Sequence, residues 1–160
     1  MATEIERKFL VDTTRWRPGS SGVAYRQGYL AGSKKGVVRV RIAGGRGYLT
    51  IKSATEGISR SEFEYPIPVA DATAMLDALC ERAPIEKTRY REEFAGRVWE
   101  VDVFHGDNDG LVVAEIELTT AAEEVALPSW VRREVSDDPR YFNNNLAVRP
   151  YKEWGRARSG

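Results

Sequence analysis

Apolar and polar residues alternate with a period of two along most of this 160-residue chain. Val38, Val40 and Ile42 share one face of such a stretch. Arg39 and Arg41 share the opposite face. Because successive side chains of a strand point to opposite faces, this spacing is typical of β-strands. The pattern predicts strands at residues 4–11, 23–31, 37–42, 48–53, 59–69, 85–94, 98–104 and 111–119, with a shorter one at 130–135.

Helical spacing is clear in one segment only, residues 70–82. There Ala72, Leu76 and Leu79 fall on one helix face, and Pro84 stops the segment. Weaker patterns predict helices at residues 120–126 and at about 140–147, followed by a mobile end from residue 159.

Short turns, most of which contain glycine, join the predicted strands. This organisation favours an antiparallel meander or a closed barrel. We find no internal repeat, low-complexity tract or linker, so residues 1–160 read as one domain. The predicted fold class is α+β, and mainly β.

Composition narrows the function classes. The 24 Lys and Arg residues balance 24 Asp and Glu residues, so no global field marks a nucleic-acid binder. Cys80 is the only cysteine, which excludes an internal disulfide and fits a reducing, cytoplasmic compartment. His105 is the only histidine and precedes a Gly- and Asp-rich turn, so a multi-His zinc centre or a Ser-His-Asp triad fits poorly. No apolar run could span a bilayer, and we expect no secretory signal.

At least six predicted strands carry paired charges on one face and apolar side chains on the other. Two arrangements satisfy this pattern. In one, a sheet packs its apolar face into a core and shows its charges to water. In the other, the sheet closes around a charged interior, and helices cover its apolar outer face. The alternation alone favours the first arrangement.

The segregation of charge by sign favours the second arrangement. Like charges two apart on a strand repel, and a solvated face normally mixes the signs. Pairs of carboxylates suit a hard divalent cation, whereas pairs of Arg and Lys suit phosphate oxygens. A metal-bound polyphosphate needs both, so we predict that these faces converge in one interior tunnel. The acidic pairs are Glu4/Glu6, Glu62/Glu64 and Glu115/Glu117, and the basic pairs are Arg39/Arg41 and Lys87/Arg89.

The order of these charges is similar to that of a known family. Glu4-x-Glu6-x-Lys8 near the N-terminus resembles the opening motif of the CYTH superfamily, the triphosphate tunnel metalloenzymes. That motif alone is weak, but the ordered set is specific and covers nearly the whole chain. It continues as Arg39-x-Arg41, Lys52, Glu62-x-Glu64, Lys87-x-Arg89, Asp102 and Glu115-x-Glu117.

The resemblance implies a single CYTH domain over residues 1–160. Its fold would be an eight-stranded antiparallel closed β-barrel that forms a triphosphate tunnel, with helices packed outside. The side chains implied to bind the triphosphate are Lys8, Arg39, Arg41, Lys52, Lys87 and Arg89.

The resemblance also implies two ions of Mg²⁺ or Mn²⁺. Glu115 and Glu117 would hold the ion that positions the triphosphate. Glu4 and Glu6 would hold the ion that activates water, and these two acids with Lys8 form the implied catalytic group. The weaker candidates are Glu62, Glu64, Asp102 and Glu134, for which charge pairing is an equal alternative, and Tyr29, which would close a tunnel mouth or pack.

The implied activity is that of a small bacterial-type inorganic triphosphatase. Such a metal-dependent hydrolase cleaves a phosphoanhydride bond of tripolyphosphate, or of a triphosphate-bearing compound such as ATP or thiamine triphosphate. One alternative is a class IV-type adenylate cyclase, whose products would be cyclic AMP and pyrophosphate. Another is a noncatalytic polyphosphate- or nucleotide-binding module, against which the intact acids argue.

The expected partner is therefore a small triphosphate, without a membrane or a stable nucleic-acid partner. The sequence leaves open whether the protein forms a homodimer. The C-terminal segment is expected either to form a lid or to pack, through Tyr141, Asn145 and Lys152.

Overall fold

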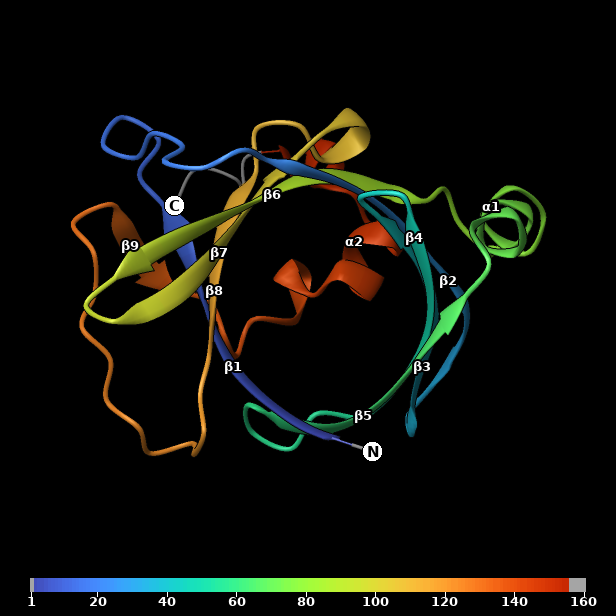
Figure 1. Cartoon of the computed structure of the whole chain (residues 1–160), viewed down its shortest axis with the longest axis horizontal. Helices are drawn as coiled ribbons and strands as arrows, with labels where there is room; N and C mark the ends of the chain where they lie inside the picture. Colours follow the sequence, from blue (N-terminus) through green and yellow to red (C-terminus); the bar gives the residue numbers. More distant parts are fainter. Residues whose placement is uncertain (1, 156–160) are drawn as a thin grey trace.

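The computed structural model describes residues 2–155 and contains one antiparallel sheet that closes on itself. The strand order is β5-β4-β3-β2-β6-β7-β8-β1-β9, and a further pairing of β5 with β1 completes an eight-stranded barrel, seen as a ring in Figure 1. β9 is added outside that closure, along β1. The strands are β1 (Ala2–Val11), β2 (Val23–Ser33), β3 (Gly36–Ala43), β4 (Arg46–Ser53), β5 (Ser59–Ile67), β6 (Ile85–Phe94), β7 (Arg97–Phe104), β8 (Val112–Glu117) and β9 (Val131–Glu134).

β1 closes the barrel because its two halves pair with different strands. Its first half, from Ala2 to Ile5, pairs with β5, and its second half, from Glu6 to Leu10, pairs with β8. The strand therefore carries the first charged motif of the sequence across the seam between the two ends of the sheet. The predicted closed barrel is confirmed.

Two tight turns show why glycine recurs between the strands. Gly44 and Gly45 connect β3 to β4 with φ of 55° and 84°, and Ala95 and Gly96 connect β6 to β7 with φ of 51° and 75°. Two consecutive residues with positive φ form the hairpin turn whose twist matches that of the flanking strands. The hairpin predicted at the Gly-rich stretch after β3 is confirmed.

α1 (Val69–Ala78) packs on the outer face of the barrel, as expected, although it is shorter than the predicted 70–82. Val40 of β3 is fully buried beneath Ala72 and Leu76 of the helix. Gly28 of β2 permits this contact, because a Cβ there would lie 2.3 Å from the Sγ of Cys80. Cys80 is thus a packing residue at the edge of this cluster.

The predicted helix at 120–126 is wrong, because this segment forms turns and loop. Glu123 Oε1 accepts hydrogen bonds from the backbone N and the Oγ1 of Thr119, at 2.7 and 2.8 Å. The backbone N of Glu123 donates to the carbonyl of Thr120 at 3.2 Å, so the segment closes a turn there instead of a helix. The loop nevertheless covers the outer face of the barrel, where Trp130 packs edge-on against Trp99, with ring centroids 5.8 Å apart.

The C-terminal segment differs from the expectation that helices pack outside the barrel. The predicted helix at 140–147 is split into a 3₁₀ turn, Pro139–Tyr141, and α2 (Asn143–Val148), because Phe142 is extended. Figure 1 shows α2 within the outline of the barrel. The mobile end predicted from residue 159 lies outside the described residues.

Apolar residues at one end of the barrel interior explain this position. Ile85, Phe104 and Val113 lie on the inner face of the sheet, because they share or directly oppose the positions of Lys87 and Asp102. The C-terminal residues buried against them are Val135, Tyr141, Leu146 and Trp154. The C-terminal segment therefore buries these apolar residues, which the charged side chains of the barrel interior could not do.

We predict that Trp99→Ala lowers the free energy of unfolding by about 3–5 kcal/mol, the usual cost of truncating a fully buried aromatic. Trp99 is 0% exposed and also contacts Phe9, at 5.6 Å between ring centroids. Denaturant unfolding measures the effect, with Val98→Ala on the same strand as control, because Val98 is 37% exposed. Equal losses in the two variants would contradict this account of the outer core.

Candidate active site

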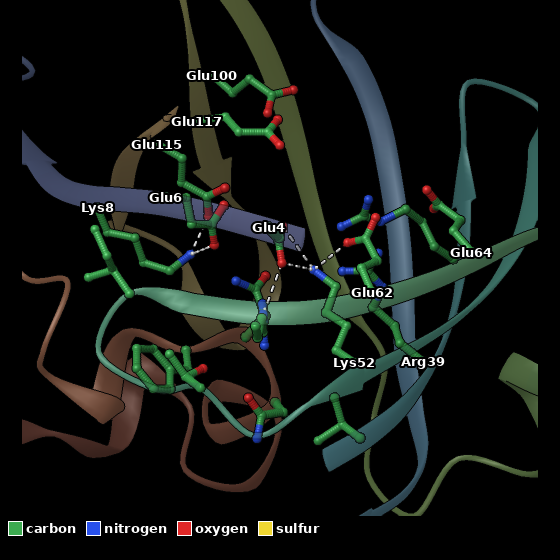
Figure 2. A pocket seen from close by; sticks show the side chains of 18 of the residues that line it. Glu4, Glu6, Lys8, Arg39, Lys52, Glu62, Glu64, Glu100, Glu115 and Glu117 are labelled. Atoms are coloured by element: carbon green, nitrogen blue, oxygen red, sulfur yellow. Dashed lines mark hydrogen bonds and ion pairs between the residues drawn. The ribbon is translucent and has the colours of Figure 1, made fainter. Parts of the chain in front are cut away.

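The charged inner faces of seven strands converge on one cavity of about 180 Å³ (Figure 2). The predicted convergence is thus confirmed, with the C-terminal segment covering one end of the barrel. Among the described residues, the predicted side chains that line the cavity are Glu4, Glu6, Lys8, Tyr29, Arg39, Arg41, Lys52, Glu62, Glu64, Lys87, Arg89, Glu115 and Glu117.

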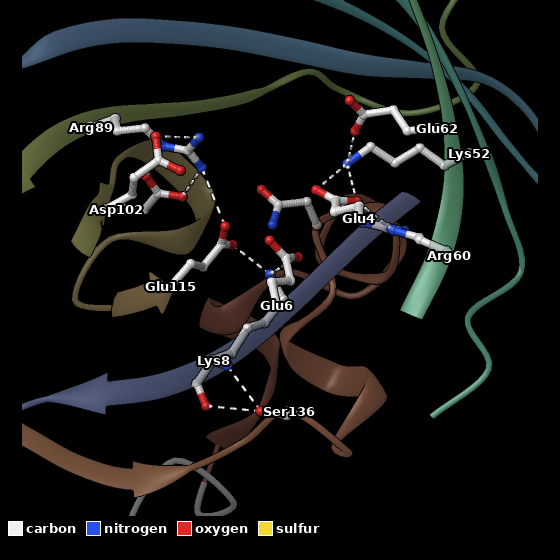
Figure 3. Close-up of polar contacts among 12 residues, drawn as sticks. Glu4, Glu6, Lys8, Lys52, Arg60, Glu62, Arg89, Asp102, Glu115 and Ser136 are labelled. Carbon is white, nitrogen blue, oxygen red and sulfur yellow. Dashed lines mark hydrogen bonds and ion pairs between the residues drawn. The ribbon is translucent and has the colours of Figure 1, made fainter. Parts of the chain in front are cut away.

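Most cavity cations are paired with carboxylates (Figure 3). Lys8 donates a short hydrogen bond to Glu115 and lies 3.4 Å from Glu6. Lys52 lies 3.0 Å from Glu4 and 3.3 Å from Glu62. Burial disfavours the charged form of Lys8, but Glu115 and Glu6 raise its pKa above the ordinary value. For Lys52, burial and the neighbouring Arg39 lower the pKa despite the attraction of Glu4.

Asp102 holds two further cations, although it is only 1% exposed. Lys87 Nζ lies 2.7 Å from its Oδ2, and Arg89 donates from Nε to Oδ1 at 2.7 Å and from Nη2 to Oδ2 at 2.9 Å. Burial alone would raise the pKa of Asp102, but Arg89 and Lys87 hold it below its ordinary value. Asp102 is therefore an internal counter-ion beside the cavity.

Arg39 and Arg41 are held differently. In residues 2–155, no carboxylate forms an ion pair with either guanidinium. Arg41 donates from Nε to Gln27 at 3.0 Å and lies 4.9 Å from the ring centroid of Tyr25. Burial, Arg39 and Arg89 lower the pKa of Arg41 to about 10.

Arg39 is also short of partners within the described chain. It is 5% exposed, its Nε is buried without a hydrogen-bond partner, and its Nη2 reaches Thr50 only at 3.4 Å. A buried donor without a partner costs free energy, and a guanidinium fork matches phosphate oxygens. This side of the cavity is therefore suited to bind an anion.

The opposite side of the cavity carries an excess of acids. Glu6 pairs directly across the strands with Glu117, and Lys8 pairs with Glu115. Burial raises the pKa of Glu6 to about 7, and repulsion from Glu115 and Glu4 contributes to that rise. Burial and neighbouring glutamates also raise the pKa of Glu117. A cation at this position would relieve the repulsion.

We tested whether these residues fit a divalent metal ion. In residues 2–155, no three acidic, His or Cys side chains are already grouped as a complete ligand set. Glu6, Glu115 and Glu117 still supply the hard oxygen donors that Mg²⁺ and Mn²⁺ prefer. Because Mg²⁺ commonly binds through one or two carboxylates together with substrate phosphates, the donor set fits an ion that arrives with its substrate.

Some cavity residues were not predicted from the sequence. Arg60 donates to Glu4 at 2.9 Å, and Glu100 lies 3.3 Å from Arg89. Both could have been found, since Arg60 shares a strand face with Glu62, and Glu100 shares one with Asp102. Asn143 on α2 also lines the cavity, but no sequence signal marked it.

Glu134 is the predicted site residue that the structure places away from the cavity. Its carboxylate is paired with Arg7, at 2.7 Å, and its side chain is 38% exposed. Arg7 belongs to the opposite face of β1 from Glu6 and Lys8. Glu134 therefore joins an ion pair on the outer side of the barrel.

The three tail residues considered for a lid also lie elsewhere. Tyr141 is buried against Trp154, Asn145 donates to the carbonyl of Pro139 at 2.8 Å, and Lys152 lies 2.8 Å from Asp107. These contacts support packing. His105 is exposed, with its Nε2 2.7 Å from Thr88 Oγ1, and lies outside this cavity.

The family model described as the CYTH domain matches residues 2–151 of the chain. This protein belongs to the CYTH family. It is 49% identical over 154 residues to the inorganic triphosphatase of Acetivibrio thermocellus, which covers 96% of this chain and 99% of that protein. It is 39% identical over 151 residues to the inorganic triphosphatase of Nitrosomonas europaea, at 91% and 97% coverage.

A crystal structure of the inorganic triphosphatase NE1496 is similar in fold. It superposes with a TM-score of 0.67 and 36% identity, covering 92% of this chain and 96% of that chain. The closed barrel and its CYTH membership are thus shown by sequence and by structure. No helix in residues 2–155 is long and apolar enough to cross a membrane.

We predict that Asp102→Asn lowers the free energy of unfolding at pH 7 by about 3–5 kcal/mol, because it leaves two buried cations without their carboxylate. Its matched control is Glu134→Gln, which breaks a partly exposed pair and should cost less than about 1 kcal/mol.

The pH dependence of this loss follows from the lowered pKa of Asp102. The stabilisation is present above the ordinary aspartate pKa of about 4 and is lost as the pH falls through the lower folded-state value. The free energies of unfolding of the parent and of Asp102→Asn, measured from pH 7 to pH 2, should therefore converge in acid. A pH-independent difference would contradict the assignment.

Proposed function

We propose that this protein is a metal-dependent inorganic triphosphatase that hydrolyses a phosphoanhydride bond of tripolyphosphate within the barrel. The observation that carries the proposal is the polarity of the cavity. Arg39, which is buried, and Arg41, which is half-buried, have no carboxylate partner within residues 2–155, and they face a cluster of acids that includes Glu6. The relatives named inorganic triphosphatases support the same activity.

The cationic side would bind the polyphosphate chain. Arg39 and Arg41 offer guanidinium forks, and Lys8, Lys52, Lys87 and Arg89 add charge along the cavity wall. Hydrolysis spreads negative charge over the non-bridging and leaving oxygens, and preorganised cations stabilise that charge without moving.

The acidic side would hold Mg²⁺ or Mn²⁺ through Glu6, Glu115 and Glu117, with Glu4 a further candidate after release from Lys52 and Arg60. When bound, such an ion neutralises phosphate charge and lowers the pKa of a water ligand. Glu4, Glu6 and Lys8 are the proposed catalytic group. We propose that two ions bind, and that each is Mg²⁺ or Mn²⁺.

ATP and thiamine triphosphate are secondary candidates as substrates. The order of preference among these substrates can be tested by measuring phosphate release from tripolyphosphate, ATP and thiamine triphosphate side by side with each metal. We expect tripolyphosphate to be hydrolysed with the highest kcat/KM. Cyclic AMP formed from ATP would instead identify a cyclase, and tight binding of every compound without turnover would identify a binding module.

Metal dependence gives a second test. Phosphate release from tripolyphosphate should stop in excess EDTA and return on addition of Mg²⁺ or Mn²⁺, because oxygen donors dominate the cavity. Full turnover in excess chelator would rule out the metal-dependent mechanism.

Two substitutions should separate binding from turnover. Glu6→Gln keeps the side-chain volume but removes a metal-binding charge, so kcat should fall about 100-fold or more, equivalent to roughly 3 kcal/mol, while tripolyphosphate still binds. Arg39→Ala removes a phosphate contact that persists into the transition state, so it should raise KM and also lower kcat.

Steady-state kinetics and direct tripolyphosphate binding measure both effects, and thermal melts confirm folding. Glu86→Gln is the matched control for Glu6→Gln, because Glu86 is exposed on β6 and lies outside this cavity. A folded Glu6→Gln protein with the kcat of the parent would contradict the catalytic role of β1.

A further inference from the structure

Gln27 connects a cavity arginine to the C-terminal segment. It is 0% exposed on β2, its Oε1 accepts from Arg41 Nε at 3.0 Å, and its Nε2 donates to Asn143 Oδ1 at 3.1 Å. Because a guanidinium can only donate, the oxygen of this amide must face Arg41. The orientation of Gln27 is therefore fixed by its partners.

Asn143, the first residue of α2, makes a parallel contact. Its Oδ1 also accepts from Lys87 Nζ at 3.0 Å, in addition to the bond from Gln27. Lysine too can only donate, so this amide oxygen must face the cations. Two amides thus link the C-terminal segment to Arg41 and Lys87.

The amide oxygen of Gln27 holds Arg41 without cancelling its charge, whereas Lys87 is held both by Asn143 and by the carboxylate of Asp102. Lys8 and Lys52 are each paired with carboxylates, which neutralise them before any ligand binds. Gln27 anchors Arg41 through Nε alone, and in the described chain the Nη atoms of Arg41 donate to no protein group. The outer edge of the guanidinium, which binds phosphate oxygens in pairs, is left available.

We propose that Gln27 and Asn143 are positioning residues for the phosphate chain, and that the C-terminal segment completes the binding site through Asn143. The pair holds Arg41 in place without neutralising it, and gives Lys87 a neutral acceptor beside its ion pair with Asp102. Docking of α2 and binding of the phosphate chain are therefore coupled. This inference rests on the proposed function, because the ligand is the tripolyphosphate chain.

An isosteric charge change distinguishes this role from packing. Asn143→Asp keeps the oxygen that accepts from Lys87 and Gln27, so the segment stays docked, but it adds negative charge beside the bound phosphates. We expect the Kd of tripolyphosphate, measured by calorimetry in EDTA, to rise on the order of tenfold or more, with no loss of Tm. Asn145→Asp makes the same chemical change on α2 outside the cavity and should bind like the parent. Because it removes the hydrogen bond to the carbonyl of Pro139, its Tm is measured alongside its Kd.

A second pair of variants tests the link itself. Gln27→Met removes the amide contacts to Arg41, Asn143 and Tyr29 at similar volume. Arg41 then loses its anchor, and KM for tripolyphosphate should rise more than kcat falls. Because Gln27 and Asn143 act through one hydrogen bond, Gln27→Met and Asn143→Ala should be non-additive in binding. Additive effects, or a lowered Tm with unchanged Kd, would overturn the proposal.

The binding measurement separates this inference from the proposed reaction. If the parent binds tripolyphosphate but does not hydrolyse it with either metal, the proposed reaction fails and the Kd of Asn143→Asp still decides the positioning role. If the parent hydrolyses tripolyphosphate and Asn143→Asp binds it within about twofold of the parent, only the positioning role fails. A parent that does not bind tripolyphosphate at all overturns both.

Discussion

The structure depends on the balance of charge inside a closed barrel. Within residues 2–155, seven Lys or Arg residues and seven Glu residues line the cavity, so the interior is close to neutral as a whole. The two signs are nevertheless separated, because like-charged pairs repeat along single strands. Buried charges are costly unless they are paired, and Asp102 with Lys87 and Arg89 shows how most of that cost is met. Arg39 and Arg41 have no carboxylate partner in the described part of the chain, so a bound anion would balance their positive charge.

The barrel could be predicted from the sequence because the patterns that indicate it involve residues close together in the chain. A period of two places Arg39 and Arg41 on one face whatever the rest of the chain does, and the glycine turns make neighbouring strands antiparallel. The sign of the charges then indicated that these faces point inward. Glu134 shows the limit of this reasoning, since alternation could not tell that its strand lies outside the barrel closure, where Arg7 is its partner.

The contribution of the C-terminal segment could not be predicted for a different reason. Its contacts join residues far apart in the sequence, such as Asn143 with Gln27, 116 positions away, and no periodic pattern encodes them. The inner faces of β6, β7 and β8 change from charged to apolar residues within two positions, at Ile85, Phe104 and Val113. This change is a sign in the sequence that an apolar element enters that end of the barrel. Hydrophobic burial thus brings α2 to the cavity, and two amides then align it with the cations.

A crystal structure with tripolyphosphate bound, in the presence of Mg²⁺ or Mn²⁺, tests the central claim most directly. The account predicts phosphate oxygens within hydrogen-bond distance of the Nη atoms of Arg39 and Arg41, with the metal between those phosphates and the side chains of Glu6, Glu115 or Glu117. Tripolyphosphate bound on the outer surface of the barrel, or in the cavity without contact to either arginine, would contradict it.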